Sequence, residues 1–131
     1  MRGSSMSALK LAAYAIDCAD PRRLAEFYGR LLGWQIDEEE SGDRWVELAD
    51  PAGGAPLAFQ LDPDHRPSTW PDREVPQMAH LDVRVDTLDE GHERAIGAGA
   101  VQLPQPPDQL DASFRVYVDP EGHPFCMCAA Q

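Results

Sequence analysis

The chain has 131 residues, 43% of them hydrophobic, and its 23 acidic and 11 basic residues give a formal net charge of -12. This length suits a single domain with its own core. No apolar run approaches the ~18 residues of a transmembrane helix, and an acidic chain repels nucleic-acid phosphates. We therefore expect neither a membrane nor a nucleic acid as partner. Three cysteines, an odd number, indicate free thiols in a reducing cytoplasm.

Two similar modules account for most of the sequence. The first six residues, Met-Arg-Gly-Ser-Ser-Met, look like a leader, so we assign the single domain to residues 7–131. Within it, residues 20–34 recur in altered form as residues 86–100, each beginning with Asp and continuing as a helix that a Gly closes. This is typical of an internal repeat, with modules at about 9–61 and 78–130. Two such modules can build one cleft between them.

The first module is predicted to run β-α-β-β-β. A strand within Leu9–Cys18 leads to Asp20 and Pro21, which suit the N-cap and the first position of a helix. Apolar residues at helical spacing then form one stripe, and Gly33 ends the helix. Three short strands are expected at residues 34–37, 44–49 and 57–61.

A proline-rich connector at residues 62–77 joins the modules, and its four prolines exclude a helix or a central strand. The second module repeats the same order, with a helix at about 88–98. Its strands are expected at residues 78–85, 101–103, 114–118 and 124–129. The predicted fold class is therefore α+β, with two tandem βαβββ modules.

The strand at 78–85 predicts a polar wall. Its apolar residues alternate with His80, Asp82 and Arg84, which therefore share one face. A histidine beside an acid is a candidate general base, because the acid raises the pKa of the imidazole. The alternative is that His80 is a hydrogen-bonded histidine lining a disused pocket.

The ordered motifs carry a family resemblance. They are Asp20 with Phe27-Tyr28 and Leu32-Gly33-Trp34, then His80-Leu81-Asp82-Val83-Arg84-Val85-Asp86, then Asp119-Pro120-Glu121-Gly122-His123-Pro124-Phe125. At this spacing, the chain resembles the glyoxalase, bleomycin-resistance and extradiol-dioxygenase superfamily, also called vicinal oxygen chelate proteins. Trp70-Pro71, Pro76-Gln77-Met78 and Cys126 after Phe125 are similar to its glyoxalase-like subfamily. The resemblance implies curved sheets that enclose one cup-shaped site, and a homodimer.

The resemblance also implies where a divalent metal would bind, at one position on the first and the last strand of each module. These positions are Ala13, Gln60, His80 and Cys126 in this sequence. Without the two carboxylates of the metal-dependent relatives, little offsets the charge of a divalent ion, so we expect no cofactor and no metal site of the glyoxalase I type. The alternative is an atypical metal site with His80, Cys126 and Cys128, although a buried free cysteine is more often a small hydrophobe.

Other candidate ligand-binding residues border the expected cup. Tyr14 and Trp70 offer aromatic surface, and Trp70, surrounded by prolines, is hard to bury in a sheet and suits a lid. Arg115 is the cationic candidate for a ligand carboxylate if its side chain faces inward. Together with Gln60, Asp82 and Cys126, these residues form the predicted binding set.

Three hypotheses follow. The first is a glyoxalase-like protein that binds an unassigned small organic molecule, one version of which is sequestration of a cationic antibiotic, which the acidic charge and the bleomycin-resistance branch suggest. The second is an enzyme, a lyase or isomerase with His80 as base or a metalloenzyme with unusual ligands. The third is a scaffold whose cup is filled by side chains.

Overall fold

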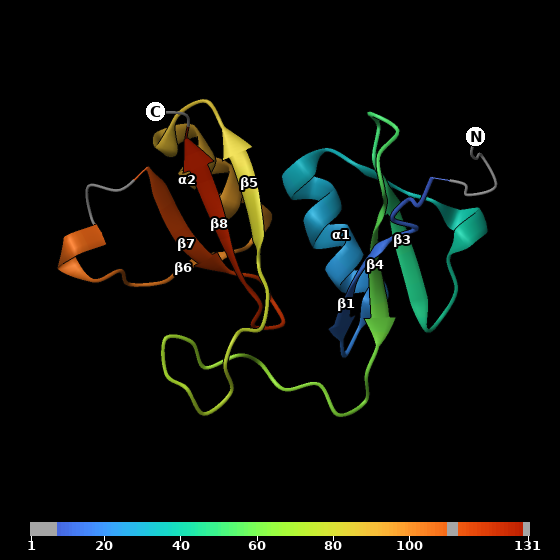
Figure 1. Cartoon of the computed structure of the whole chain (residues 1–131), viewed down its shortest axis with the longest axis horizontal. Helices are drawn as coiled ribbons and strands as arrows, with labels where there is room; N and C mark the ends of the chain where they lie inside the picture. The colour runs from blue at the N-terminus through green and yellow to red at the C-terminus, as the bar shows by residue number, and fades with distance from the viewer. Residues whose placement is uncertain (1–7, 110–112, 130–131) are drawn as a thin grey trace, which may run out of the picture.

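A computed structural model describes residues 8–109 and 113–129, and it shows the two predicted modules side by side (Figure 1). The expected leader, residues 1–6, lies outside the described residues. Both modules run in the order β-α-β-β-β, with one short 3-10 helix in each. The tandem βαβββ fold predicted from the sequence is confirmed.

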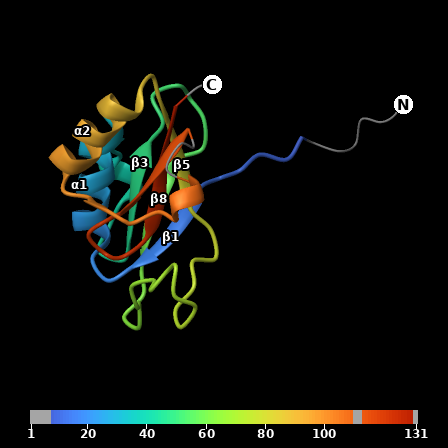
Figure 2. The ribbon, with the colours of Figure 1, turned by 90° about the vertical axis from the view of Figure 1, so that its left-hand side faces the viewer.

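The first module forms a mixed four-stranded sheet in the order β1-β4-β3-β2. β1 and β4 are parallel, and the other pairs are antiparallel. Its elements are β1 (Tyr14–Cys18), α1 (Pro21–Leu32), β2 (Gln35–Ile36), the 3-10 helix Glu38–Glu40, β3 (Trp45–Ala49) and β4 (Leu57–Leu61). β1 is shorter than predicted, because β4 begins after Pro56, and residues 8–13 extend away from the body (Figure 2).

The second module forms an equivalent sheet in the order β5-β8-β7-β6, with β5 and β8 parallel. Its elements are β5 (Leu81–Val85), α2 (Leu88–Ala98), β6 (Val101–Gln102), the 3-10 helix Pro107–Gln109, β7 (Phe114–Val118) and β8 (Pro124–Ala129). β1 and β5 are the edge strands that face the other module, so the seam between the modules runs between them (Figure 1).

The two sheets match residue for residue at their parallel strand pairs. Tyr14 pairs with Leu57 at the start of β1 and β4, as Leu81 pairs with Phe125 at the start of β5 and β8. This register makes each position of one module the counterpart of one position of the other. The counterparts are Ala13 and His80, Ala15 and Asp82, Asp17 and Arg84, Ala58 and Cys126, and Gln60 and Cys128.

Local sequence explains both helices. The Asp20 carboxylate accepts the Arg23 N–H at the start of α1, and Thr87 does the same for Glu90 at the start of α2. Gly33 and Gly99, both at positive φ, end the two helices. The predicted N-cap Asp20 and the predicted glycine ends are confirmed, Thr87 is a cap that the sequence analysis did not predict, and together they fix where each helix leaves its sheet.

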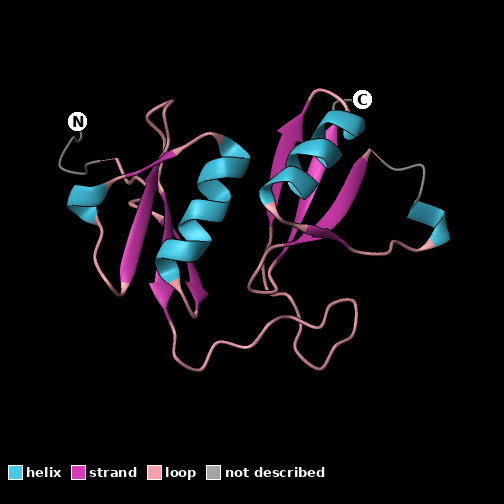
Figure 3. Ribbon diagram, turned by 180° about the vertical axis from the view of Figure 1, so that it is seen from behind, coloured by secondary structure: helices cyan, strands magenta, loops and turns pink. Residues whose placement is uncertain are grey.

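The core lies between the helices and one face of each sheet, since both helices cover the same side of the molecule (Figures 2 and 3). Aromatic rings of both modules meet there: Tyr28 of α1 stacks on Phe59 of β4 and contacts Phe125 of β8, which stacks on Tyr117 of β7. These four residues are at most 1% exposed. The opposite sheet faces are therefore left to form the walls of a site.

Two arginines tie the helices together. Arg30 of α1 donates to the carbonyl of Ala98 at 3.0 Å, and Arg94 of α2 donates to the carbonyl of Leu31 at 2.8 Å. Each guanidinium thus binds the last turn of the other helix, where carbonyls lack helical partners.

Among the described helices, none has the length and apolar character to cross a membrane.

Candidate functional site

Strand alternation builds a polar wall on the second module. Leu81 and Val83 of β5 pack against the core, so His80 and Asp82 occupy the opposite face. On the adjacent strand β8, Phe125 and Met127 are buried in the core, which places Cys126 and Cys128 on the same wall as Asp82. The predicted polar face therefore lies beside two thiols.

The His80 and Asp82 side chains contact each other. Nε2 of His80 lies 3.1 Å from Oδ1 of Asp82, and the two side chains are 40% and 61% exposed. One donor atom each from His80, Asp82 and Cys126 lie within 4.8 Å of one another. A carboxylate that orients an accessible imidazole is the arrangement of a general base, and the same three groups are ligand types for a transition metal.

Both thiols of this wall are held in the protonated form. Burial, followed by the negative charge of Asp82, raises the pKa of Cys126 to about 12. The same two causes raise the pKa of Cys128, and Arg84 partly opposes them. At neutral pH these cysteines are therefore weak nucleophiles.

A pocket of about 390 Å³, which we call the cup pocket, opens in front of this wall. Trp70 and Gln77 come from the connector, and Phe114 and Val116 come from β7. The other described lining residues are His80, Asp82, Gln109, Ser113, Cys126 and Cys128. The structure thus brings together four of the predicted site residues, namely His80, Asp82, Trp70 and Cys126. Aromatic surface beside a few polar groups is typical of a small-molecule site.

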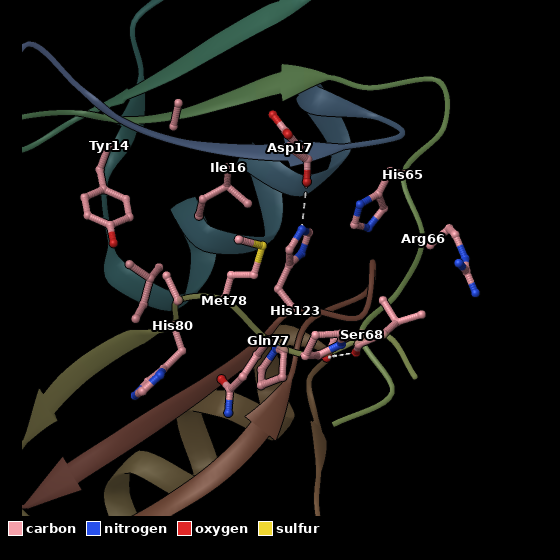
Figure 4. Close-up of a pocket in the computed structure, with 16 residues that line it drawn as sticks. Tyr14, Ile16, Asp17, His65, Arg66, Ser68, Gln77, Met78, His80 and His123 are labelled. Carbon is pink, nitrogen blue, oxygen red and sulfur yellow. Dashed lines mark hydrogen bonds between the residues drawn. The ribbon is translucent and has the colours of Figure 1, made fainter. Parts of the chain in front are cut away.

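A second pocket of about 290 Å³, the seam pocket, lies between β1 and β5 (Figure 4). Its wall is mostly apolar, with Tyr14, Ile16 and Met78 among the lining residues. His80 and Gln77 line both pockets, so the two cavities adjoin at these side chains. The Oε1 atom of Gln77 is buried and has no hydrogen-bond partner within the described part of the chain.

The turn at residues 119–123 fastens the second module to the first. Asp119 is 4% exposed and accepts the hydroxyl of Tyr28 at 2.7 Å. His123 places Nδ1 2.8 Å from the same carboxylate and Nε2 2.7 Å from the carbonyl of Asp17 on β1 (Figure 4). Burial alone lowers the pKa of His123, but Asp119, the Asp17 carbonyl and Glu121 outweigh it and raise that pKa.

Glu121 and His65 extend this network to the connector. The Glu121 carboxylate accepts the backbone N–H groups of Ala19 and Asp20 before α1. His65 stacks on His123 with ring centroids 4.8 Å apart and places Nε2 2.9 Å from the Glu121 carbonyl. His65 and His123 thus join the modules, while His92 contacts the hydroxyl of Tyr117 at 2.8 Å.

Three predicted ligand-binding residues lie outside the cup pocket. Tyr14 lines the seam pocket. Gln60 is on β4 of the first module, opposite Asp17 and Trp45, and Arg115 shares its face of β7 with Tyr117, next to α2. Sequence analysis did not single out Gln77, which lines both pockets. Its signal was its place in the Pro76-Gln77-Met78 motif, three residues before His80.

The family's metal positions do not form one site in this chain. Ala13 has no side-chain donor, Gln60 lies on the first sheet, and only His80 and Cys126 share a pocket among the described residues. Within the second module, Asp82 and Cys128 line the same pocket as those two residues. The residues present do not fit a metal held between the two modules, and we derive no reaction step through one.

Two paired βαβββ sheets with an open cup define the chain as a protein of the vicinal oxygen chelate superfamily. A family model described as a glyoxalase-like domain matches residues 13–128, and the chain belongs to this family. No curated protein matches the sequence.

Solved structures with the same fold include proteins described as resistance factors. One is a glyoxalase/bleomycin resistance protein/dioxygenase family enzyme from Burkholderia phytofirmans, with a TM-score of 0.71 and 20% identity over 94% of this chain and 100% of that one. Fosfomycin resistance proteins FosX are also similar. The protein from Listeria monocytogenes has a TM-score of 0.66 and 14% identity over 95% and 94% of the chains. The protein from Mesorhizobium loti has a TM-score of 0.62 and 14% identity over 95% of both chains. At these identities the likeness shows the fold.

Proposed function

We propose that this glyoxalase-like protein binds a small organic molecule in the cup pocket, without a metal of the glyoxalase I type. The observation that carries the proposal is the His80–Asp82 contact, at 3.1 Å, on the wall of a cavity of about 390 Å³. Trp70 and Phe114 provide aromatic surface for the body of a ligand, and His80, Asp82 and Gln77 provide polar contacts that orient it. An open cavity of this size argues against a cup filled by side chains.

The charge of the pocket favours a neutral or cationic ligand. Among its described lining residues, Asp82 is the acid, and none is Lys or Arg. The chain as a whole carries a net charge of -12, which attracts cations to the site over long range. Together with the structural likeness to resistance proteins, this charge supports the second candidate, sequestration of a cationic antibiotic.

The free cysteines support a reducing, cytoplasmic location.

A thermal-shift screen of metal-free protein tests the binding proposal. A specific ligand raises the melting temperature increasingly as its free concentration exceeds its Kd. We expect hits to be enriched in aromatic cations, and we expect Trp70→Ala and Asp82→Asn to weaken their binding. Trp45→Phe, on the first sheet outside the cup pocket, is the control. A library without a saturable hit, or hits that bind equally to Trp70→Ala, would contradict the proposal.

The enzyme alternative rests on the same dyad. If His80 acts as a base, a ligand found in the screen is converted, and His80→Gln removes turnover while leaving the melting temperature close to wild type. Asp82→Asn would lower kcat because the amide no longer orients the imidazole as the carboxylate does. Binding without any product, in reduced protein with and without added metal, would support sequestration.

A further inference from the structure

We propose that His80, Asp82 and Cys126, with Cys128 as the fourth donor, form a binding site for one zinc-class metal ion on the second sheet. The site lies in the wall of the cup pocket but does not depend on the organic ligand proposed above. It differs from a metal site shared between modules, because all four donors come from β5, β8 and the residue directly before β5.

Geometry is the first support. The donor atoms of His80, Asp82 and Cys126 lie within 4.8 Å of one another, and zinc with bonds of about 2.0–2.3 Å needs only a small side-chain adjustment to bind all three. Asp82 lies opposite Cys126 on the neighbouring strand, and Cys128 follows two residues later on the same face of β8 and lines the same pocket. The Cys128 side chain therefore faces the same cavity as the other three donors.

The chemistry of the donors selects the class of metal. Two sulfurs, one imidazole nitrogen and one carboxylate oxygen form a mixed soft set that suits tetrahedral zinc and disfavours magnesium or calcium, which prefer oxygen. Binding releases one proton from each thiol to solvent, so the bound set carries three negative charges against two positive ones. Arg84, the neighbour of Cys128 across β5 and β8, lies on the same wall to offset the excess.

The internal repeat supplies a second, independent observation. The first-module counterparts of His80, Asp82 and Cys126 are Ala13, Ala15 and Ala58. Three alanines therefore stand where the second module carries three potential ligands, on strands of matching register. The backbone of the βαβββ module does not require polar groups at these positions. Their presence in one module alone points to a use for the cluster beyond folding.

Cobalt titration of reduced, metal-free full-length protein tests the proposal. We expect one Co²⁺ per chain, with visible bands of tetrahedral cobalt and a near-ultraviolet sulfur-to-cobalt charge-transfer band, and displacement by one equivalent of Zn²⁺. Removal of a group that only supports a ligand costs about 10- to 100-fold in metal affinity, so loss of a ligand in Cys126→Ser or His80→Gln should cost at least that much. Each cysteine variant should also lose about half of the charge-transfer intensity.

Cys18→Ala is the matched control, because Cys18 is the third free cysteine and is buried in the core of the first module. It should keep the full cobalt spectrum. The wild-type protein offers a readout that needs no variant: in folded protein, Zn²⁺ should slow the alkylation of Cys126 and Cys128 and leave the rate at Cys18 unchanged, as mapped by mass spectrometry. Metal-free protein in the ligand screen separates failure of this site from failure of the organic-ligand proposal.

Three results would overturn the metal site. The first is the absence of a charge-transfer band at one equivalent of cobalt. The second is a band that keeps its full wild-type intensity in folded Cys126→Ser. The third is a stoichiometry of two ions per chain, since the first module has no equivalent donors.

Discussion

His123 joins the two modules with one ring, since Nδ1 contacts the Asp119 carboxylate of its own turn and Nε2 contacts the carbonyl of Asp17 on β1. Both partners are hydrogen-bond acceptors, so the imidazole satisfies both only when each ring nitrogen carries a proton. The turn that connects β7 and β8 therefore binds the first module through a protonated imidazole, and the strength of this contact depends on pH.

We expect His123 to make stability decline as the pH rises. Its pKa is raised in the folded state, so its contribution is complete below the unfolded value of about 6.5 and is lost as the pH rises through the folded pKa. Urea unfolding of the wild type and His123→Gln should show the largest difference in free energy at mildly acid pH and a smaller one at alkaline pH. His80→Gln, which changes a histidine outside this network, should keep the wild-type slope. A constant difference across this range would contradict the assignment.

Tyr28 is expected to matter more for stability than Tyr117, although both rings are fully buried. Tyr28→Phe leaves the buried carboxylate of Asp119 without this donor, and a hydrogen bond to a charged group contributes about 1.5–3 kcal/mol. Tyr117→Phe removes a neutral hydrogen bond to His92 and should cost about 0.5–1.5 kcal/mol. Chemical denaturation of both variants checks the order, and equal losses would argue against a charged Asp119 in the core.

Gly122 is expected to resist substitution more than other turn glycines. Its φ is +88°, and a Cβ added there would collide with Cβ and Cα of Pro67 in the connector. Gly53 has a similar φ of +84° with nothing within 4 Å of an added Cβ. Gly53→Ala should therefore cost only the left-handed strain of about 1–2 kcal/mol, and Gly122→Ala clearly more. Thermal unfolding of the two variants tests whether the connector is packed against the turn.

The Cys126 thiol should react slowly and speed up when Asp82 loses its charge. Burial and then Asp82 raise the pKa of Cys126 to about 12, so its alkylation rate should still be rising with pH at alkaline pH. Asp82→Asn removes the second cause and should increase the rate at a fixed pH. Mass spectrometry of the Cys126 peptide after timed alkylation measures this. Asp86→Asn, outside the cup pocket, is the control.

Most of the fold could be predicted from local patterns. β4, α2, β7 and β8 have the predicted bounds, because alternation, caps and turns lie within a few residues of each element. β1 was predicted to lie within Leu9–Cys18, and it occupies Tyr14–Cys18 of that span. Small and apolar residues continue through 9–13, but a strand needs a partner, and β4 offers none before Leu57. Strand length thus depends on a segment far along the chain.

The site could be predicted where strand parity was unambiguous. In β5 the alternation is clean, and His80 and Asp82 lie on the wall as expected. β7 has apolar residues on both faces, so its sequence does not show whether Arg115 faces the cup or α2. The contact between His123 and Asp17 spans 106 positions of the sequence, and only the docking of one module on the other brings it about.

Because the two sheets have matching register, the first module offers a scaffold like that of the second module but without the polar side chains of its site. Ala15 and Ala58 occupy the strand positions that Asp82 and Cys126 occupy in the second module, and Ala13 directly precedes β1 as His80 directly precedes β5. Substituting His, Asp and Cys at these three alanine positions would test whether the backbone scaffold of the module is enough to support the chemistry of the site. Conversely, substituting alanine for His80, Asp82 and Cys126 would give a chain in which neither module carries the three polar side chains. Any activity of the natural protein can be compared with that of this variant.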